Sequence, residues 1–275
     1  MSVMDSQFVT EENIQRFQQK ILIFYQENKR DLPWRNTTVP YYILVSEFML
    51  QQTQVSRVID YYNNWIEKWP TVQSLANTPY KEVLTGWMGL GYNRRAMYLH
   101  NSAKTIVRDF DGDVLDAVKN YEKLPGIGPY TSNAVQIFSA NADIATVDTN
   151  IRRIFINEFQ LHESISDKEL FRLAEKCLPK GRSRDWHNAL MDYGALYLTS
   201  KKTGIKPKTQ QSRFQGSDRQ IRGQILRLLL RETQSIYQIQ KKLDVDANRL
   251  STILDKMQKE ETIDKKDNFY MVPNR

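Results

Sequence analysis

Apolar residues recur at helical spacing along most of the chain, and the strict alternation that would indicate strands is rare. Residues 8–28 are predicted to form a helix with Thr10 as its N-cap. A second helix is predicted from Tyr42, and its apolar positions continue at the same spacing as far as Ile59. Short helices separated by Gly- and Pro-containing turns follow up to residue 198. The pattern therefore predicts a mostly all-α fold.

The composition changes at residue 200. Residues 200–217 are rich in Lys and Arg and poor in large apolar side chains, which predicts a basic linker. Residues 218–275 then carry three amphipathic segments and DKKDNFYMV (264–272), which resembles a pair of hairpin strands. Three helices and such a hairpin match the winged helix-turn-helix pattern. We therefore predict one domain over 1–199 and a small winged-helix-like domain over 218–275.

Charge and cysteine content narrow the possible classes of protein. The chain has 275 residues, a net charge of +7 and a pI near 9.3, which suits a polyanionic partner, although many basic proteins bind no nucleic acid. The single cysteine, Cys177, excludes an intrachain disulfide and a cysteine-built metal site, and three histidines make a zinc site unfavoured. Since no apolar run is long enough to span a bilayer and no signal pattern opens the chain, we expect an intracellular protein without membrane contact.

The sharpest local motif is LPGIGPYT, residues 124–131. Gly126 and Gly128 allow a tight backbone turn. Peptide N–H groups at the start of the following helix, which includes Thr131, can then point at one phosphate. This arrangement predicts a non-specific grip on a duplex backbone, although a short Gly-Pro turn is weak on its own.

A second motif, VDTNIRR (147–153), lies downstream of the first. Asp148 stands just before a basic helix start, where an ordinary N-cap aspartate would also stand. The combination of an LPGIG turn with a downstream VDxNxRR segment is much less expected by chance than either motif.

Residues 30–195 resemble the helix-hairpin-helix (HhH-GPD) DNA glycosylase superfamily, whose hallmarks are such a hairpin, a Gly/Pro-rich loop and a catalytic aspartate. Within it, RDLPWR (30–35), SEFMLQQTQV (46–55), GLGY (89–92) and ALMDYGAL (189–196) stand in the order of the adenine-excising branch. The resemblance implies a helical fold of two lobes with a DNA cleft between them.

The resemblance implies the catalytic residues by position. Glu47 corresponds to the general acid that protonates the base at N7, and Asp148 to the electrostatic or covalent stabiliser of the sugar cation. Tyr130 stands where bifunctional lyases carry a lysine, so no Schiff base can form there and a monofunctional enzyme is expected. Asn150 resembles the asparagine that positions the aspartate or a water.

The remaining family positions concern base flipping. Gln52, Leu90 and Tyr92 match the wedge that fills the gap in the duplex, although each could equally be a core residue. Residues that resemble the lining of the adenine pocket are Arg30, Trp34, Asn188 and Met191.

The chain departs from the family in two respects. Relatives commonly hold an iron–sulfur cluster with four cysteines, but Leu198 stands where the first would fall, so no cluster and no other cofactor is expected. Residues 218–275 are also too short for the usual C-terminal domain that reads 8-oxoguanine. That segment is expected to give a second DNA contact, or else to serve as a protein-docking or packing module.

The leading hypothesis is therefore a monomeric glycosylase that excises adenine opposite 8-oxoguanine or guanine in double-stranded DNA and leaves an abasic site. Asn188 weakens the adenine assignment, because adenine enzymes typically carry glutamine there. The alternatives are a thymine or uracil glycosylase for G·T and G·U mismatches, a non-catalytic DNA-binding protein on this scaffold, and a transcription factor that binds through the winged helix alone.

Overall fold

The computed structural model describes residues 8–205 and 213–274 and divides the chain into two compact units. Unit 1 comprises residues 1–44 and 127–210, and unit 2 comprises residues 45–126 and 211–275. The domain predicted over 1–199 thus contributes to both units, while 218–275 shares a unit with 45–126. Part of the predicted basic linker, residues 206–212, lies outside the described residues. Among the residues that are described, no helix is both long and apolar enough to cross a membrane.

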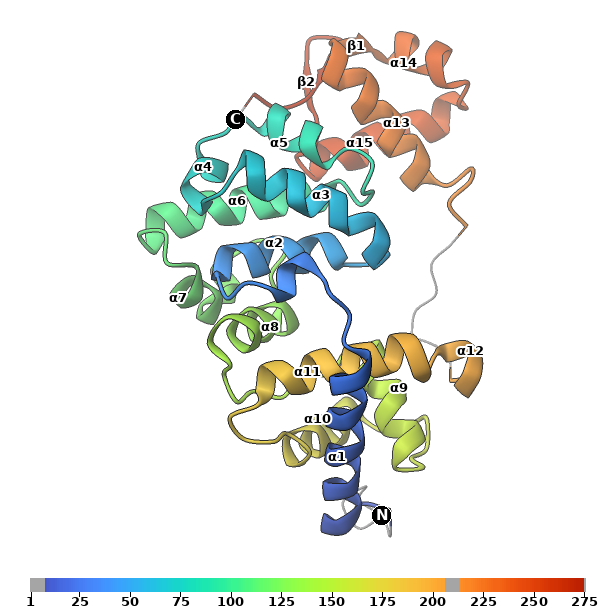
Figure 1. Ribbon diagram of the computed structural model, residues 1–275. Helices are drawn as coiled ribbons and strands as arrows, with labels where there is room; N and C mark the ends of the chain where they lie inside the picture. The colour runs from blue at the N-terminus through green and yellow to red at the C-terminus, as the bar shows by residue number, and fades with distance from the viewer. Residues whose placement is uncertain (1–7, 206–212, 275) are drawn as a thin grey trace. The chain divides into compact units, whose positions relative to one another are not determined.

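Unit 1 is helical throughout its described part (Figure 1). Its elements are α1 (Glu11–Asn28), the short 3-10 helix η2 (Pro33–Arg35), the start of α2 (Pro40–Leu50), α8 (Pro129–Ala140), α9 (Thr149–Glu158), α10 (Asp167–Lys176), α11 (Ser183–Asp192), the π-helical turn η4 (Tyr193–Tyr197) and α12 (Ser200–Thr203).

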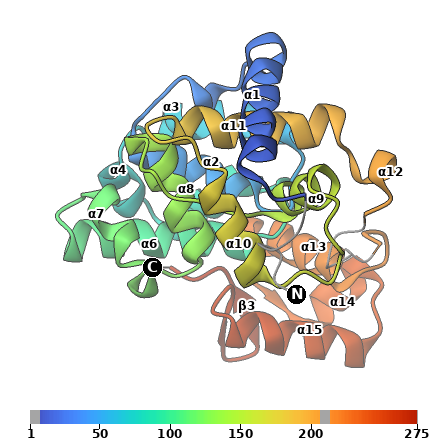
Figure 2. The same cartoon turned by 90° about the horizontal axis from the view of Figure 1, so that it is seen from below.

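The core of unit 1 joins its two chain segments. Helix α1 packs along α11, as both views show (Figures 1 and 2). The Phe17 ring lies edge-on to Trp186 at 5.5 Å and within 5.6 Å of Phe155, so aromatic side chains fill the contact. The predicted first helix is confirmed, and the hydroxyl of Thr10 caps it by accepting the N–H of Asn13.

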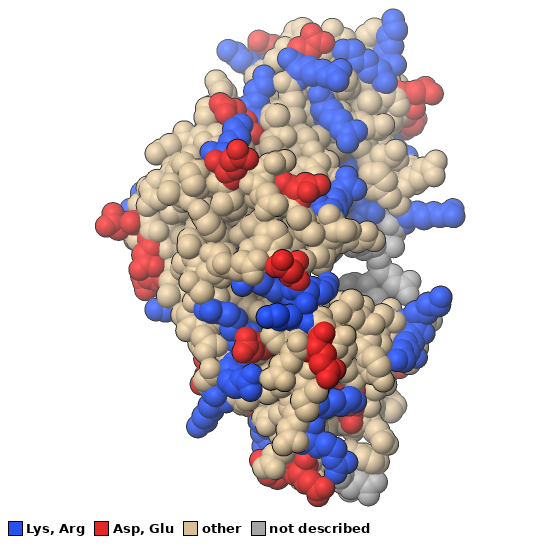
Figure 3. All heavy atoms as spheres, viewed as in Figure 1, with Lys and Arg blue, Asp and Glu red and all other residues tan. Residues whose placement is uncertain are grey.

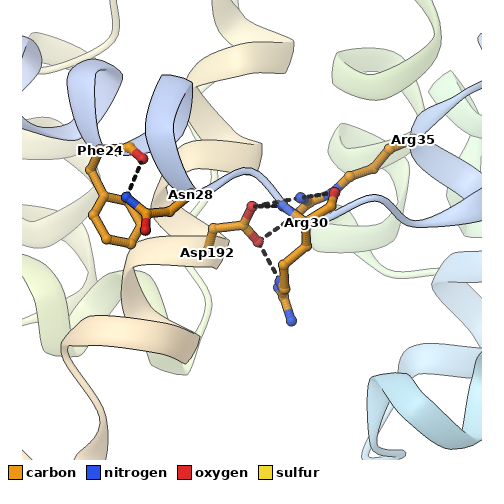
Figure 4. Close-up of polar contacts among 5 residues, drawn as sticks. All are labelled: Phe24, Asn28, Arg30, Arg35 and Asp192. Atoms are coloured by element: carbon orange, nitrogen blue, oxygen red, sulfur yellow. Dashed lines mark hydrogen bonds and ion pairs between the residues drawn. The ribbon is translucent and has the colours of Figure 1, made fainter.

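A buried carboxylate also ties these segments together (Figure 4). The Asp192 side chain, at the end of α11, is 0% exposed. Its oxygens accept from Arg30 Nε–H at 2.6 Å and from both terminal nitrogens of Arg35 at 2.7 and 2.8 Å. The backbone N–H of Arg30 donates to the same carboxylate at 3.0 Å. Four donors therefore fix the loop between α1 and α2 against α11.

Burial and ion pairing act on Asp192 in opposite directions. Burial alone would raise the pKa of its carboxyl group, but the hydrogen bonds and charges of Arg35 and Arg30 outweigh burial, and the pKa lies below its usual value. Asp192 therefore stays ionised at neutral pH.

Unit 2 contains a helical part and a small C-terminal part. The helical part has the end of α2, α3 (Val55–Lys68), α4 (Val72–Ala76), α5 (Tyr80–Trp87), α6 (Arg94–Asp109), α7 (Val114–Lys119) and the 3-10 helix η3 (Tyr121–Lys123). Helix α6 packs on α4 and α5. Trp65 contacts Trp69 and Trp87 at ring-centroid distances of 4.5 and 5.5 Å, which makes a buried tryptophan cluster.

The second helix predicted from Tyr42 to Ile59 is wrong as one element. Helix α2 ends at Leu50 and α3 begins at Val55. Between them Gln52 adopts φ +55°, a left-handed conformation that a continuous α-helix cannot contain. The apolar spacing continues across the break, which is why periodicity alone does not reveal it.

The C-terminal part has the elements that the sequence predicts, with one addition. They are α13 (Asp218–Arg231), β1 (Gln234–Ser235), α14 (Ile236–Leu243), α15 (Ala247–Lys259), β2 (Asp264–Lys266) and β3 (Phe269–Met271). The hairpin of β2 and β3 is confirmed as antiparallel, and β1 pairs with β3 through Gln234 opposite Tyr270. Strand β1 is only two residues long, too short for a periodic pattern. The assignment as a winged helix stays a prediction.

Replacing Asp192 by asparagine should destabilise the fold. The change leaves two partly desolvated guanidinium groups without their counter-charge, at a cost of about 3 kcal/mol in the free energy of unfolding. Urea denaturation at neutral pH measures the difference from the native protein. Glu12→Gln, which removes the exposed ion pair with Arg16, is the control and should leave stability unchanged.

The pH dependence gives an internal check. The pKa of Asp192 is lower in the folded protein than in the unfolded chain, where it is about 3.9. Asp192 therefore stabilises the fold fully above about pH 4, and this contribution to the free energy of unfolding is lost as the pH falls through the folded pKa. The difference in the free energy of unfolding between the native protein and Asp192→Asn should therefore become smaller below about pH 4. A constant difference, or superposed unfolding curves at neutral pH, would contradict this account.

Candidate active site

Asp148 is the N-cap of α9 in unit 1. Its Oδ1 accepts the backbone N–H of Ile151 at 2.7 Å, and its Oδ2 accepts the side-chain N–H of Asn150 at 3.2 Å. The capping role, which the sequence left as an alternative to catalysis, is thus observed. Capping and catalysis are compatible, because the cap holds both carboxylate oxygens in one orientation.

The electrostatics of Asp148 reflect opposing effects. Burial raises the pKa of its carboxyl group above the usual value, and this effect dominates. Hydrogen bonds from Ile151 and Asn150 and the positive charge of Arg153 act in the other direction. Asp148 is partly exposed, and the surrounding residues solvate its carboxyl group less well than water does, so the hydrogen bonds and the charge of Arg153 oppose the effect of burial.

Arg153 connects Asn150 to the segment that follows α11, a role that was not predicted from the sequence. Its Nη2–H groups donate to Asn150 Oδ1 at 2.8 Å and to the Gly194 carbonyl at 3.0 Å, and its Nε–H donates to the Leu198 carbonyl at 2.8 Å. A Cβ on Gly194 would approach the Cβ of Asn150 to 3.2 Å, so glycine permits this close approach. Within VDTNIRR the second arginine was the available signal.

The segment that follows α11 closes unit 1 with apolar side chains. Leu198 and Ile205 are buried in its core, and the Nζ of Lys202 lies 3.7 Å from the centre of the Tyr197 ring. Helix α12 lies between them, capped by Thr199 and ended by Gly204 at φ +73°. The chain is therefore packed where the family resemblance would place the first cluster ligand.

The predicted pocket residues lie on two segments of unit 1. Arg30 engages Asp192, and Trp34 in η2 is 9% exposed. Asn188 and Met191 lie on α11, the helix that ends with Asp192. Asn188 is buried, whereas Met191 is partly exposed. Asp192 and Arg35 were not predicted, although the RDLPWR and ALMDYGAL motifs contain them.

His187, beside Asn188, holds the segment that leads to Asp148. Its Nε2 accepts the Thr146 N–H at 3.3 Å, while Nδ1 lies 2.7 Å from the Ser183 carbonyl, which assigns the proton to Nδ1. Burial lowers the pKa of His187 to about 4, so the ring is neutral. The neutral His187 ring therefore links α11 to the segment that precedes α9 through hydrogen bonds.

The helix that follows the PGIG turn carries three predicted residues. Gly128 is the N-cap of α8 and provides no side-chain cap, and Tyr130 and Thr131 lie in its first turn. Tyr130 is partly exposed and Thr131 is buried. Helix α8 packs against α11. The phosphate-binding role stays a prediction.

Glu47 lies on α2, within unit 2. It is partly exposed, while its neighbours Val45, Phe48 and Met49 are fully buried. A routine surface glutamate would not stand in the middle of such an apolar run. The role of Glu47 as an acid stays a prediction.

Two of the three predicted wedge residues have left-handed backbones in unit 2. Gln52 adopts φ +55° and is exposed, and Tyr92 adopts φ +48° and is partly exposed. Such conformations in non-glycine residues are uncommon and recur at functional sites. Leu90 differs, because it is only 4% exposed; it occupies a core position, as the sequence allowed. Gly126 adopts φ +77°, and a Cβ there would lie 2.6 Å from the Tyr98 ring.

Arg95 holds the backbone beside the predicted wedge residues Gln52 and Tyr92, a role that no sequence motif predicted. Its Nη1–H groups donate to the carbonyls of Phe48, Met49 and Gln51 at 2.7–2.9 Å, which satisfies the end of α2. Its Nη2–H groups donate to the Gly91 carbonyl at 3.0 Å and to the Thr53 hydroxyl at 3.0 Å. Burial lowers the pKa of Arg95 to about 10, so it remains charged at neutral pH.

His, Cys, Asp and Glu side chains are the groups that could hold a metal ion. Within residues 8–205 and 213–274, no group of three or more His, Cys, Asp or Glu side chains could hold a metal ion. Cys177 is buried, and burial raises the pKa of its thiol to about 12.

The chain resembles known proteins over most of its length. Residues 45–180 match the model of the HhH-GPD superfamily base excision DNA repair protein. The chain is 37% identical over 247 residues to the adenine DNA glycosylase of Mycolicibacterium smegmatis, covering 82% of this chain and 84% of that protein.

Two solved structures share the architecture. A thermostable thymine-DNA glycosylase is 31% identical with a TM-score of 0.64, covering 70% of this chain and 90% of its own. An endonuclease III–DNA covalent intermediate is 18% identical with a TM-score of 0.62, covering 73% and 91%, which shows the fold alone. The chain therefore belongs to the HhH-GPD superfamily of base excision DNA repair proteins, in the family of the adenine DNA glycosylases.

Proposed function

We propose that this protein is a monofunctional adenine DNA glycosylase that acts as a monomer, inside the cell, on adenine mispaired with 8-oxoguanine or guanine. The observation that carries the proposal is Asp148, whose two oxygens are held by the start of α9 and by Asn150. The 37% identity with a curated adenine DNA glycosylase supports the choice of base. Double-stranded DNA is then the substrate, and the net charge of +7 suits it.

The proposed chemistry assigns one role to each carboxyl group. Glu47 donates a proton to N7 of the adenine, so that the bond between C1′ and N9 breaks and its electron pair leaves with the base. Asp148 stabilises the positive charge that develops on the sugar. A water molecule then adds to C1′ and loses a proton, and the products are free adenine and an abasic site.

Tyr130 supports the monofunctional assignment. Opening the sugar by a lyase step needs an amine that forms a Schiff base at C1′, and a phenol cannot form one. We propose that Tyr130, in the first turn of α8, supports Asp148 or the sugar instead.

The residues of the chain do not fit the iron–sulfur cluster that relatives of this family usually hold. A [4Fe–4S] cluster takes four thiolates, and the chain has one cysteine, buried in the core of unit 1. We propose that the enzyme works without a cluster. In its place, the buried side chains of Leu198 and Ile205 and the hydrogen bonds of Arg153 stabilise the segment that follows α11.

A second candidate is a thymine or uracil glycosylase for G·T and G·U mismatches. The 31% identity with a solved thymine-DNA glycosylase favours it, as does Asn188, which is shorter than the glutamine typical of adenine enzymes. The adenine proposal is preferred because the identity with the adenine DNA glycosylase is higher, at 37% against 31%, and extends over more of the chain, at 82% against 70%.

Four labelled duplexes containing A·8-oxoguanine, A·G, T·G or U·G test the proposal. We expect strand breaks at adenine after alkali treatment and intact strands without alkali, because no lyase step occurs. Asp148→Asn and Glu47→Gln should each lower the single-turnover rate by at least about 100-fold.

Asp113→Asn is the matched control, because Asp113 is also an N-cap aspartate and accepts the Asp116 N–H at 2.9 Å, on α7. It should excise at the native rate. Cleavage confined to T or U would transfer the protein to the mismatch branch, and no cleavage at any base would reject catalysis.

Replacing Arg153 by glutamine should slow excision and change its pH dependence. The Arg153 charge lowers the pKa of Asp148, so its removal raises that pKa further. The acid limb of the pH–rate profile, which reports the ionised carboxylate, should then move to higher pH. Single-turnover rates from pH 5 to 9 measure the shift.

Arg152→Gln is a close control on the same helix, since Arg152 is also buried but bonds to the Glu163 carbonyl. It should leave the acid limb in place. An unshifted limb in Arg153→Gln, with equal folding of both variants, would show that Arg153 has no electrostatic effect on Asp148.

A further inference from the structure

Aromatic rings and arginines alternate in unit 2, from the core to the surface. The Arg95 guanidinium lies 5.2 Å from the centre of the Trp87 ring and 5.5 Å from that of Tyr92. The Arg219 guanidinium lies 4.9 Å from the Tyr92 ring and 5.5 Å from the Phe214 ring. We call these five residues the aromatic–arginine row. It begins at buried Trp87 and ends at Phe214, which is 58% exposed.

The row connects a predicted wedge loop to the C-terminal part of the chain. Tyr92 belongs to GLGY, whereas Arg219 lies in the first turn of α13 and Phe214 just before it. Arg219 also donates a hydrogen bond to the Tyr92 hydroxyl. A second contact joins the same parts, because Glu260 pairs with both Arg94 and Arg222. The contacts of Arg219 thus hold the start of α13 beside Tyr92, and the Glu260 pairs join the same C-terminal part to Arg94, close to Tyr92 in sequence.

The outer end of the row has the chemistry of a nucleic-acid contact. Exposed aromatic rings stack on unpaired bases of any sequence, and neighbouring arginines contact the phosphates. Arg213 is exposed beside Phe214, and the nearby carboxylate of Asp218 is paired with Arg249 at 2.7 Å. In Figure 3, Lys and Arg side chains (blue) lie over the C-terminal helices at the top of the view, and some Asp and Glu side chains (red) lie among them.

We propose that Phe214 and Arg219 form a DNA-binding site that extends the Tyr92 wedge. Flipping a nucleotide out of the duplex leaves neighbouring bases without a stacking partner. The Phe214 ring stacks on such a base, and Arg219 contacts the adjacent phosphate while it fixes Tyr92. The inference rests on the proposed function in that it requires a flipped nucleotide, but not in which base is excised.

A competing explanation is that Phe214 merely covers the side chain of Arg219. The C-terminal part offers a matched control, because Phe269 on β3 is also an exposed phenylalanine, at 45%, and lies outside the row. Substitution of Phe269 tests the general effect of losing an exposed aromatic ring from this part of the chain.

The experiment measures binding of the full-length protein to a labelled duplex that contains a tetrahydrofuran abasic-site analogue, by fluorescence anisotropy. Phe214→Ala should weaken binding by about fivefold or more, the range for loss of one base–aromatic stack. Phe214→Trp, which keeps a stacking ring, should bind within about twofold of the native protein. Phe269→Ala should bind like the native protein.

Arg219→Ala should both weaken binding and reduce the slope of log K against log salt by about one, since one phosphate contact is lost. The proposal is overturned if Phe214→Ala binds like the native protein, or if Phe269→Ala loses as much. It is also overturned if Phe214→Trp binds as weakly as Phe214→Ala, because stacking is then not involved.

The binding assay separates this inference from the excision proposal. A native protein that removes no adenine, but whose DNA binding depends on Phe214, would refute the excision proposal and support the site. If the native protein excises adenine but Phe214→Ala binds DNA normally, the excision proposal is supported and the Phe214 site is refuted.

Discussion

The buried carboxylate of Asp192 is the constraint on which unit 1 depends. It lies about 160 positions along the chain from the two arginines that it binds, so it closes a very long loop. A charge without solvent is tolerable only when its partners are fixed, and here the partners carry the loop between α1 and α2 with them. The position of Trp34, between Arg30 and Arg35 in sequence, follows from this arrangement.

Arginine side chains play the same structural part at three places. Arg35, Arg95 and Arg153 each donate several hydrogen bonds, and their acceptors include the Asp192 carboxylate, the carbonyls at the end of α2 and the Leu198 carbonyl. The fork of donors suits this role because one side chain can bridge two segments. The two candidate functional regions, around Asp148 and around Gln52 and Tyr92, are both positioned in this way.

The sequence predicts the elements better than the contacts between them. Helical spacing identifies α1 and the C-terminal helices, because local periodicity and caps determine them. It misses the break at Gln52, since the apolar spacing runs through the turn without a glycine or proline to mark it. Motif resemblance predicts Asp148 and Glu47 as site residues, but it does not predict the bonds that Asp192 and Arg153 make with segments far away in the chain, because no local pattern records them.

The buried thiol of Cys177 has a consequence for redox chemistry. A thiol whose pKa is about 12 is almost entirely protonated at neutral pH, and peroxide reacts with the thiolate. As the only cysteine, it leaves the chain without an accessible sulfur that could form a sulfenic acid or a mixed disulfide. The oxidising conditions that damage guanine would therefore leave this protein without a thiol lesion, and no reducing agent is needed to keep it in one thiol state.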